Sequence, residues 1–352
     1  MAAVDRRARR LGGLAARHRD ETGDRAVGRD HPAVRAAMKR VRGQRHRGVA
    51  LISALLVVAL ATTAAVALTT SMQLNLRRSA NLYLRDQAWQ YLIGVEEFAK
   101  VLLQQAIQHD KLDLLLGEER MLPVEGGVVS GRIVDLQAGV NLNDLIDDKD
   151  KVNPEARARV EALFKARGVD LRRIDALIDW LDANDRQSGN DGAEDNYYFG
   201  LQPPYRAANR QMESLSELYL IREMTPEDVK ALTDNAVDGK PVPLLNVIHK
   251  EKGRLKTLTA VNINTASEDV LDAIGVVDIK NVVDNRPWKK IPTPKDMGLK
   301  GKQKVTGIDV KSEFYLLEAT ARIGRAKLKS FSIIQVQKGN KMAVVSRSFG
   351  AR

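Results

Sequence analysis

The spacing of hydrophobic and polar positions predicts one long helix near the start of the chain. Residues 49–68 contain no charged side chain, and the next charge along the chain is that of Arg77. Residues 77–108 mix apolar and polar side chains at helical spacing, without a proline or a turn cluster. The pattern predicts a single helix over residues 49–108, about 90 Å long at 1.5 Å per residue.

The two halves of this helix differ in character. The first half is apolar all round, and about 20 such residues span the ~30 Å hydrocarbon core of a bilayer. A cleavable secretory signal has a shorter apolar core followed by a break, whereas this pattern continues as a helix. The second half is amphipathic and is predicted to pack on the folded body. The apolar side chains that would form its packed face are Leu82, Trp89, Leu92, Phe98, Val101 and Leu102.

Beyond this helix, the pattern predicts an antiparallel sheet. Residues 126–145, GGVVSGRIVDLQAGVNLNDL, alternate and contain glycine breaks, which indicates a strand followed by a turn. Residues 313–350 predict three antiparallel strands, with turns at Gly324-Arg325 and at residues 338–340.

Residues 153–307, between the strand regions, show a helical pattern. Pro154 opens the stretch PEARARVEALFKARG and Gly168 closes it, which is typical of the first position and the C-cap of a helix. Short capped helices are predicted in DLRRIDALIDWLDA, SLSELYLI, TPEDVKALTD and TASEDVLDAIG. The predicted fold class is α+β: a long N-terminal helix packed on a small antiparallel sheet, with a large all-helical domain inserted into the sheet.

Charge and composition exclude several classes of function. The net charge is +11, but residues 1–48 hold 14 Lys/Arg against 5 Asp/Glu, so the remaining body is nearly neutral. A broad phosphate-binding face, and with it a nucleic-acid partner, is therefore not expected on the body. The chain has no cysteine, and three of its five histidines lie before residue 49, so a zinc site is not expected. The sequence shows no catalytic triad or phosphate loop, and we do not expect an enzyme.

A cluster of basic side chains flanks the apolar stretch on its N-terminal side, and nothing comparable follows the stretch. The positive-inside rule therefore predicts a single-pass protein with its N-terminus in the cytoplasm and its body across the membrane. The flanking residues are Lys39, Arg40, Arg42, Arg45 and Arg47.

The stretch RGVALI resembles the processing site of type IV pilin-like proteins. This resemblance implies that a prepilin peptidase cuts between Gly48 and Val49, and that Val49 becomes a methylated N-terminus. Most such proteins carry Glu at the fifth mature position, where this chain has Ser53. In lacking this Glu, the sequence resembles the K family of type II secretion minor pseudopilins (GspK). Further stretches that carry the same resemblance are DQAWQYLIGVEEFAKVLL, VNLNDL, DWLDANDRQSGNDGAEDNYY, PPYRAANRQMESLSEL, VNINTASEDVL and VVSRSFG.

The missing carboxylate has a physical interpretation. An unpaired carboxylate in an apolar bundle costs about 3 kcal/mol, and in a fibre it pairs with the N-terminal ammonium of the neighbouring subunit. A subunit at the tip has no such neighbour in front of it, and Ser53 avoids the cost. The resemblance thus implies a protein that is first inserted in the inner membrane and then lies at the tip of a periplasmic pseudopilus. There it would initiate or cap assembly of the fibre. The implied partners are pseudopilins I and J, the major pseudopilin and the prepilin peptidase.

The pattern and the resemblance together divide the chain. Residues 1–48 form a basic leader, of which residues 1–37 are expected to be disordered or an artefact of the start site, since Met38 opens a short basic leader by itself. Residues 49–76 form the membrane and fibre-core half of the helix. The expected pilin-like head comprises residues 77–152 and 308–352, and the inserted helical domain comprises residues 153–307.

The strongest candidate for a metal site is the acidic stretch over residues 179–198. It holds six carboxylates and one cation, Arg186. Calcium takes six to eight oxygen ligands, although the spacing here is not that of an EF-hand. The residues alone leave open calcium or a solvated acidic loop. The GspK resemblance implies calcium, as one or two ions. Asp179 is expected to act instead as a cap or ion-pair partner of the preceding helix, and Trp180 is expected in the core. The implied ligands are Asp182, Asp185, Asp191, Glu194 and Asp195.

The stretch over residues 261–283, VNINTASEDVLDAIGVVDIKNVV, resembles a helix-hairpin-helix, with Thr265 or Ser267 as the cap. DNA-binding versions need a second glycine after Gly275, where this chain has Val276-Val277-Asp278. A packing role is therefore favoured for this stretch.

Two alternative functions remain for the whole protein. The first is a DNA-uptake or type IV pilus minor pilin that uses the helix-hairpin-helix to bind DNA. The second is a membrane-anchored hydrolase that uses the acidic loop.

The stretch PPYRAANRQMESLSEL carries Arg206 and Arg210 beside Tyr205. These cations indicate either recognition of an anion or, as we favour, a loop clamped onto the acidic segment that precedes it.

Overall fold

The computed structural model describes residues 45–350 except 252, 254–256 and 302. The expectation for residues 1–37 falls outside the described residues. The chain forms two compact units whose boundary lies between Leu74 and Asn75. The second unit is called the head below.

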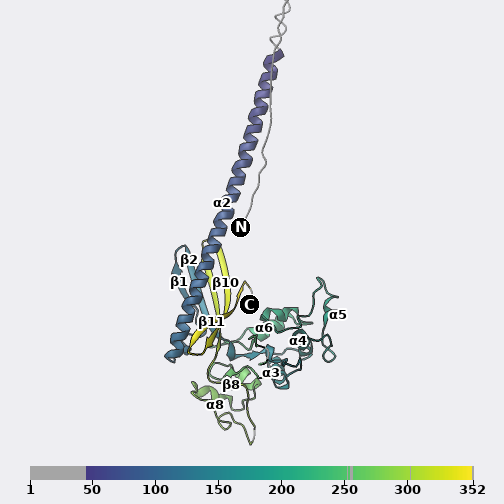
Figure 1. The fold of residues 1–352 in the computed structure, drawn as a ribbon, viewed down its shortest axis with the longest axis vertical. Coiled ribbons are helices and arrows are strands. Elements are labelled where there is room, and N and C mark those ends of the chain that lie inside the picture. The colour runs from purple at the N-terminus through teal and green to yellow at the C-terminus, as the bar shows by residue number, and fades with distance from the viewer. Residues whose placement is uncertain (1–44, 252, 254–256, 302, 351–352) are drawn as a thin grey trace, which may run out of the picture. The chain divides into compact units, whose positions relative to one another are not determined.

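The predicted long helix is present as α2, Arg45–Gln108, and begins four residues before the predicted start (Figure 1). Residues 48–74 are exposed throughout. Four threonine hydroxyl groups in this stretch donate to backbone carbonyls one turn back, as Thr62 does to Ala59 at 2.9 Å. The hydroxyl donors of these threonines are therefore all hydrogen-bonded, although their side chains lie on the apolar surface. The others that do so are Thr63, Thr69 and Thr70.

The head contains a five-stranded antiparallel sheet in the order β1-β2-β9-β10-β11. Both predicted turns are confirmed, and Gly324 and Gly339 adopt the positive φ that such turns require. β1 was not predicted, because it is an exposed edge strand that contains Pro123 and shows no buried alternation. The strands are β1 Arg120–Val124, β2 Gly127–Asp135, β9 Phe314–Ile323, β10 Ala326–Gln337 and β11 Lys341–Phe349.

The second half of α2 packs on this sheet, but through a different face from the one predicted. Of the six predicted side chains only Leu92 is buried, whereas Leu82, Phe98 and Val101 are exposed. Small side chains bring the helix close to the strands: a Cβ on Gly131 of β2 would lie 3.2 Å from Val95 Cγ1. The buried apolar face of the helix consists of Ala88, Leu92, Ala99, Leu103 and Ala106.

A buried carboxylate lies in the middle of this helix–sheet contact. Glu96 receives two hydrogen bonds from the Arg347 guanidinium of β11, at 2.9 Å and 2.5 Å, and a third from Ser332 Oγ of β10 at 2.5 Å. Glu96 is only 3% exposed. The arrangement is a bidentate, charge-assisted clamp between the helix and the last two strands.

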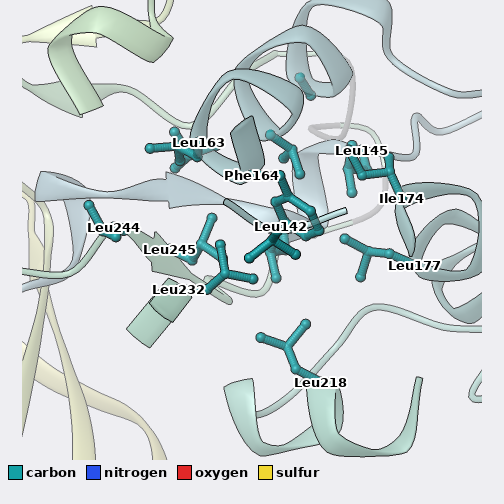
Figure 2. Close-up of a cluster of buried hydrophobic side chains, with 14 of the residues drawn as sticks. Leu142, Leu145, Leu163, Phe164, Ile174, Leu177, Leu218, Leu232, Leu244 and Leu245 are labelled. Carbon is teal, nitrogen blue, oxygen red and sulfur yellow. The ribbon is translucent and has the colours of Figure 1, made fainter. Parts of the chain in front are cut away.

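The segment between β2 and β9 carries the predicted helices and a large apolar core (Figure 2). α3 begins as expected, with Pro154 at its first position and the Asn153 side chain accepting from two backbone amides. The SLSELYLI stretch forms a 3-10 helix, η4 (Leu215–Leu220), instead of an α-helix. The helices are α3 Pro154–Ala166, α4 Arg173–Leu181, α5 Asp195–Tyr198, α6 Pro226–Thr233, α7 Glu268–Ala273 and α8 Ile279–Asp284.

Short elements complete this inserted segment. Three two-residue strand pairs lie among its helices: β3 (Val140–Asn141) with β6 (Leu245–Asn246), β4 (Ala236–Val237) with β5 (Lys240–Pro241), and β7 (Val261–Asn262) with β8 (Ile308–Asp309). The 3-10 helices η2 (Leu136–Ala138) and η3 (Leu142–Asp144) follow β2 and β3, and η1 (Leu112–Leu114) follows α2. The α+β class, with a long helix on an antiparallel sheet and a mainly helical insertion, is confirmed.

Asp135, the last residue of β2, ties the insertion to the sheet. Its carboxylate is buried and accepts hydrogen bonds from Asn262, Thr265 and Ser312 and from the backbone amide of Gln137, at 2.6–3.0 Å. Thr265 thus binds Asp135 and does not cap a helix. Ser267 occupies the N-cap position of α7 without a side-chain cap hydrogen bond.

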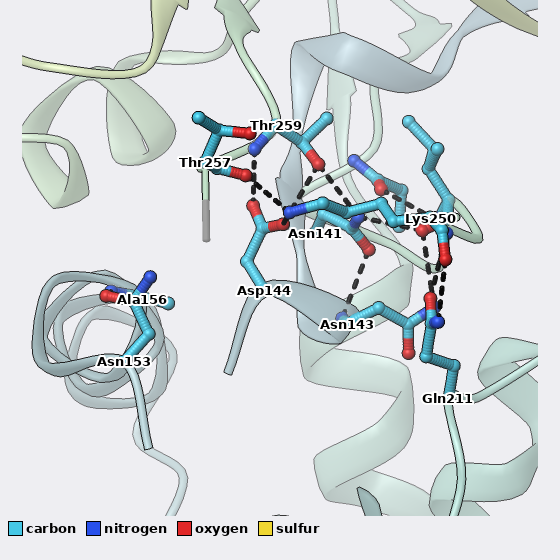
Figure 3. A network of polar contacts seen from close by, with 11 residues as sticks. Asn141, Asn143, Asp144, Asn153, Ala156, Gln211, Lys250, Thr257 and Thr259 are labelled. Carbon is cyan, nitrogen blue, oxygen red and sulfur yellow. Dashed lines mark hydrogen bonds and ion pairs between the residues drawn. The ribbon is translucent and has the colours of Figure 1, made fainter. Parts of the chain in front are cut away.

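A second polar network surrounds Asp144 and Lys250 (Figure 3). Asp144 of the VNLNDL stretch forms a buried ion pair with Lys250 at 2.6 Å and accepts from the Thr259 amide at 2.7 Å. Asn141 donates to the Ile248 carbonyl at 2.9 Å, and Asn143 donates to the Met212 carbonyl at 3.0 Å. Segments more than 60 residues apart in the sequence are joined through side chains in this way.

We expect Arg347→Met to lower the free energy of unfolding of the head by about 2–3 kcal/mol, because the buried Glu96 carboxylate would lose its cation. Urea unfolding of the full-length protein, followed by tryptophan fluorescence, measures this loss. Glu97 is exposed and pairs with Lys100 along the helix. The matched control Glu97→Gln should therefore change the unfolding free energy by less than about 0.5 kcal/mol.

The same pair sets a pH dependence. Burial by itself would raise the pKa of Glu96, but the hydrogen bonds from Arg347 and Ser332 outweigh burial and hold the pKa below its ordinary value of 4.5. Because the folded state has the lower pKa, the stabilisation is present above about pH 4.5 and is lost as the pH falls through the folded-state pKa. The effect of Arg347→Met should shrink in acid. An equal loss at about pH 7 and about pH 3 would contradict this assignment.

Candidate functional site

The apolar half of α2 has the length and composition of a membrane span. Within the helix over Gly48–Gln108, an 18-residue window has a mean hydropathy of 2.5, and none of that window is buried. Val49 is exposed, and Ser53 Oγ donates to the Ala50 carbonyl at 3.0 Å. The Ser53 hydroxyl group therefore forms its hydrogen bond within its own helix, and the side chain adds no charge to the apolar surface.

The acidic stretch forms a loop closed on itself at the end of α4. Asp179 lies in the last turn of this helix and Asp182 is its C-cap residue, while the chain returns at Glu194 just before α5. All three side chains are buried. The Ser188 amide donates to Asp179 Oδ1 at 2.8 Å, and a Cβ on Gly192 would lie 2.2 Å from Asp179 Oδ2. The loop can approach this close only with a glycine at position 192.

These three carboxylates hold uncompensated negative charge. Asp179 Oδ2, Asp182 Oδ1 and both carboxylate oxygens of Glu194 are buried without a hydrogen-bond partner in the described part of the chain. Burial raises the pKa of Asp182 to about 7, with contributions from Asp150 and Asp179. Burial likewise raises the pKa of Glu194 to about 7, and the neighbouring acidic side chains of the loop add to the shift. A cluster with orphaned oxygens and mutual repulsion is a donor set that favours a hard cation.

Two members of this cluster were missed or misassigned from the sequence. Asp150, which precedes α3, accepts from the Ala183 amide at 2.8 Å and from Asn184 at 3.3 Å. Asp150 lies 29 residues before Asp179 in the sequence, so the acidic stretch over residues 179–198 gave no indication of it. Asp179 was expected to cap a helix or to form an ion pair, but it lies inside the cluster and bonds to the backbone of the loop.

The other predicted ligands lie at the edge of the cluster or outside it. Asp185 is exposed and accepts from Asn209 at 3.3 Å, and Asp195 accepts from the Ala207 amide at 3.0 Å. Both still contribute to the raised pKa of Glu194. Asp191 also acts on Arg172, whose pKa it helps to raise after the larger effect of Asp170. Over residues 45–350 with their gaps, no three acidic or histidine side chains are arranged to hold an ion together as they stand.

Basic and aromatic side chains border the loop. The predicted clamp is partly present: Arg206 lies 3.9 Å from Asp195 and stacks over the Phe199 ring at 5.3 Å. Arg210 pairs with Glu213 and Glu217 instead, at 3.4 Å and 3.9 Å. Trp180 is buried, as predicted, and packs edge-on against Tyr198 and Tyr205.

The stretch that resembles a helix-hairpin-helix contains two short helices, α7 and α8, and the turn between them is not arranged for a phosphate. The amides of Val277 and Asp278 both donate to the Met297 carbonyl at 3.0 Å. The Asp278 carboxylate accepts from the Asn281 amide at 3.0 Å and thus occupies the anion position at the start of α8. These backbone donors are already used within the protein, which favours the packing role.

Comparisons with known proteins agree with the residues described above. A family model described as "Type II secretion system (T2SS), protein K" matches residues 138–236. The type II secretion system protein K of Pseudomonas aeruginosa is 31% identical over 333 residues, which cover 88% of this chain and 94% of that protein. The protein K of Aeromonas hydrophila is 29% identical over 340 residues, which cover 87% of this chain and 98% of that protein.

A solved structure shares the fold. It is a chain in the crystal structure of the GspK-GspI-GspJ complex from the enterotoxigenic Escherichia coli Type 2 Secretion System, with a TM-score of 0.62 and 20% sequence identity. The similarity covers 78% of this chain and 100% of that chain. Because the sequence likeness extends over nearly the whole chain and the same fold recurs, this chain belongs to the type II secretion system protein K family.

Proposed function

We propose that this chain is a minor pseudopilin located at the tip of the type II secretion pseudopilus, where it initiates or caps fibre assembly for the export of folded proteins. The observation that carries the proposal is the exposed apolar half of α2 with an uncharged fifth position after Gly48. Such a surface needs a lipid or a bundle of like helices around it.

Ser53 supports the proposed tip position. A Glu at this place would need the N-terminal ammonium of a preceding subunit, since an unpaired charge in an apolar bundle is costly. The Ser53 hydroxyl group donates to the Ala50 carbonyl and needs no partner from a neighbouring subunit. A subunit without a predecessor is thereby free of an unpaired charge.

The size of the insertion supports the same position. The chain leaves the sheet after Asp135, at the end of β2, and returns to it at Phe314, at the start of β9. The residues between these points fold around a large core of their own. A head enlarged in this way would obstruct a subunit stacked in front of it. Pseudopilins I and J are the proposed partners at the tip, because the solved chain of the same fold is part of a GspK-GspI-GspJ complex.

The membrane arrangement is proposed from the charges that flank the apolar stretch. The basic residues before Gly48 remain in the cytoplasm, α2 crosses the inner membrane once, and the head lies in the periplasm. The prepilin peptidase then cuts between Gly48 and Val49, Val49 is methylated, and the apolar half passes from lipid into the fibre with the major pseudopilin.

We also propose that calcium occupies the acidic loop, as one or two ions. Asp182 and Glu194 would supply the innermost oxygens, with Asp179 and Asp150 as further donors and Asp185 and Asp195 at the edge. A bound cation would compensate the repulsion among them and close the loop onto α4. The proposed role of the ion is structural, and no enzyme activity is proposed.

Calcium should raise the melting temperature of the detergent-solubilised full-length protein relative to the protein in chelator. Binding to the folded state alone stabilises by about 2.7 kcal/mol at a hundredfold excess over Kd. Asp182→Asn and Glu194→Gln should abolish this shift, and in chelator Glu194→Gln should melt higher than the parent because its buried charge is removed. Exposed Glu227→Gln on α6 is the matched control. Identical melting in calcium and in chelator would refute the site.

Mass spectrometry of the membrane-extracted protein should find an N-terminus at methylated Val49. Gly48→Val should leave the leader attached, whereas Gly94→Val, which also has open space around its Cβ, should be processed normally. A mature chain that begins at any other residue would contradict the proposed processing site.

Ser53→Ala should leave type II secretion unchanged, since the hydroxyl bonds only to its own helix. Ser53→Glu should lower secretion, because the new carboxylate would lack a partner ammonium at the tip. The amount of secreted substrate in culture medium measures both. Secretion that depends on a carboxylate at position 53 would overturn the tip position and leave the family assignment intact.

A further inference from the structure

The face of the sheet turned away from α2 contains a hollow of about 210 Å³. Alternate residues of β9, such as Ala319 and Ala321, belong to the core shared with α2, so the residues between them point to the opposite face. The side chains of that face that matter here are Ser130, Thr320, Arg322, Lys327, Lys329 and Phe331.

The charges in this hollow are balanced at one end alone. Arg132 pairs with Glu119 at 3.3 Å and with Glu318 at 3.7 Å. Toward the β9–β10 turn, Arg322, Lys327 and Lys329 are exposed, and none of them forms an ion pair with a described residue. Residues 314–337 contain four basic side chains and one acidic side chain.

Two of these cations oppose each other directly. In the antiparallel register of β9 and β10, Arg322 is the partner of Lys327. Like charges at directly opposed positions destabilise a strand pair. Neither of these two side chains forms an ion pair with a described residue, so the arrangement is suited to an anionic partner.

The spacing indicates which kind of anion fits. Lys327 and Lys329 are two residues apart on one face of β10, which separates their positions by about 7 Å. Carboxylates at alternate residues of an extended peptide have the same separation of about 7 Å. Beside Lys329, its cross-strand partner Thr320 and the neighbouring Ser130 offer hydroxyl groups, and Phe331, two residues further along β10, offers an apolar contact. A row of this kind fits a chain of spaced carboxylates better than a single phosphate.

We propose that this outer face of the sheet, over β2, β9 and β10, binds an extended acidic segment of another protein, with carboxylates at alternate positions. Arg322, Lys327 and Lys329 receive the carboxylates. Binding relieves the repulsion between Arg322 and Lys327, so the bound head is more stable than the free head. The surface lies on the sheet and not on the acidic loop, and the proposal does not depend on the tip position or on calcium.

The test uses detergent-solubilised full-length protein and a fluorescent peptide of alternating Glu and Thr, followed by anisotropy. The peptide should bind, bind more weakly as salt rises, and lose at least about tenfold in affinity with Lys327→Glu/Lys329→Glu. The control Lys338→Glu/Lys341→Glu makes the same change in net charge at the β10–β11 turn. It should stay within about twofold of the parent.

Several outcomes would overturn the proposal. These are equal binding of the matching Gln-Thr peptide, an equal loss in both double variants, and displacement of the peptide by inorganic phosphate or by vesicles containing phosphatidylglycerol. Folding is checked in the same samples by melting. Lys327→Glu alone should raise the melting temperature, because it places opposite charges across β9 and β10. A lower melting temperature would refute the cross-strand repulsion on which the proposal depends.

Discussion

The contact between the second half of α2 and the antiparallel sheet is the interaction on which the rest of the head depends. Its apolar part is made by small side chains, Ala88, Ala99 and Ala106 among them, which allow a close approach of helix and strands. Its polar part is the Glu96 carboxylate held by Arg347 and Ser332. Because Arg347 lies on the last strand, the contact joins the two ends of the head and orders the sheet into which the helical segment is inserted.

The inserted segment depends in turn on buried polar side chains where it leaves and rejoins the sheet. Asp135 gathers donors from the segments before β9 and before α7, and Asp144 pairs with Lys250. Each of these groups would be costly to bury alone, so the network is stable only when all of its members are in place. Hydrogen bonds of this kind specify a single arrangement of insertion and sheet, which apolar packing alone would leave less sharply defined.

Two parts of the head keep charge that the described residues do not compensate. The acidic loop concentrates carboxylates whose oxygens lack partners, and the outer face of the sheet sets Arg322 against Lys327. In both places the folded chain holds like charges together at a cost in stability. A cation in the first and an acidic segment in the second would remove that cost, and both proposals follow from this shared electrostatic logic.

The sequence by itself determined the features that depend on neighbours along the chain. The long helix, the turns at Gly324 and at residues 338–340, the capped α3 and the apolar span all follow from local periodicity and turn chemistry. The tertiary structure decided which helix face is buried, the pairing of Glu96 with Arg347, the addition of Asp150 to the acidic cluster and the register that opposes Arg322 to Lys327. These features join residues far apart in the chain. Their energies depend on burial and distance, which the order of residues does not contain.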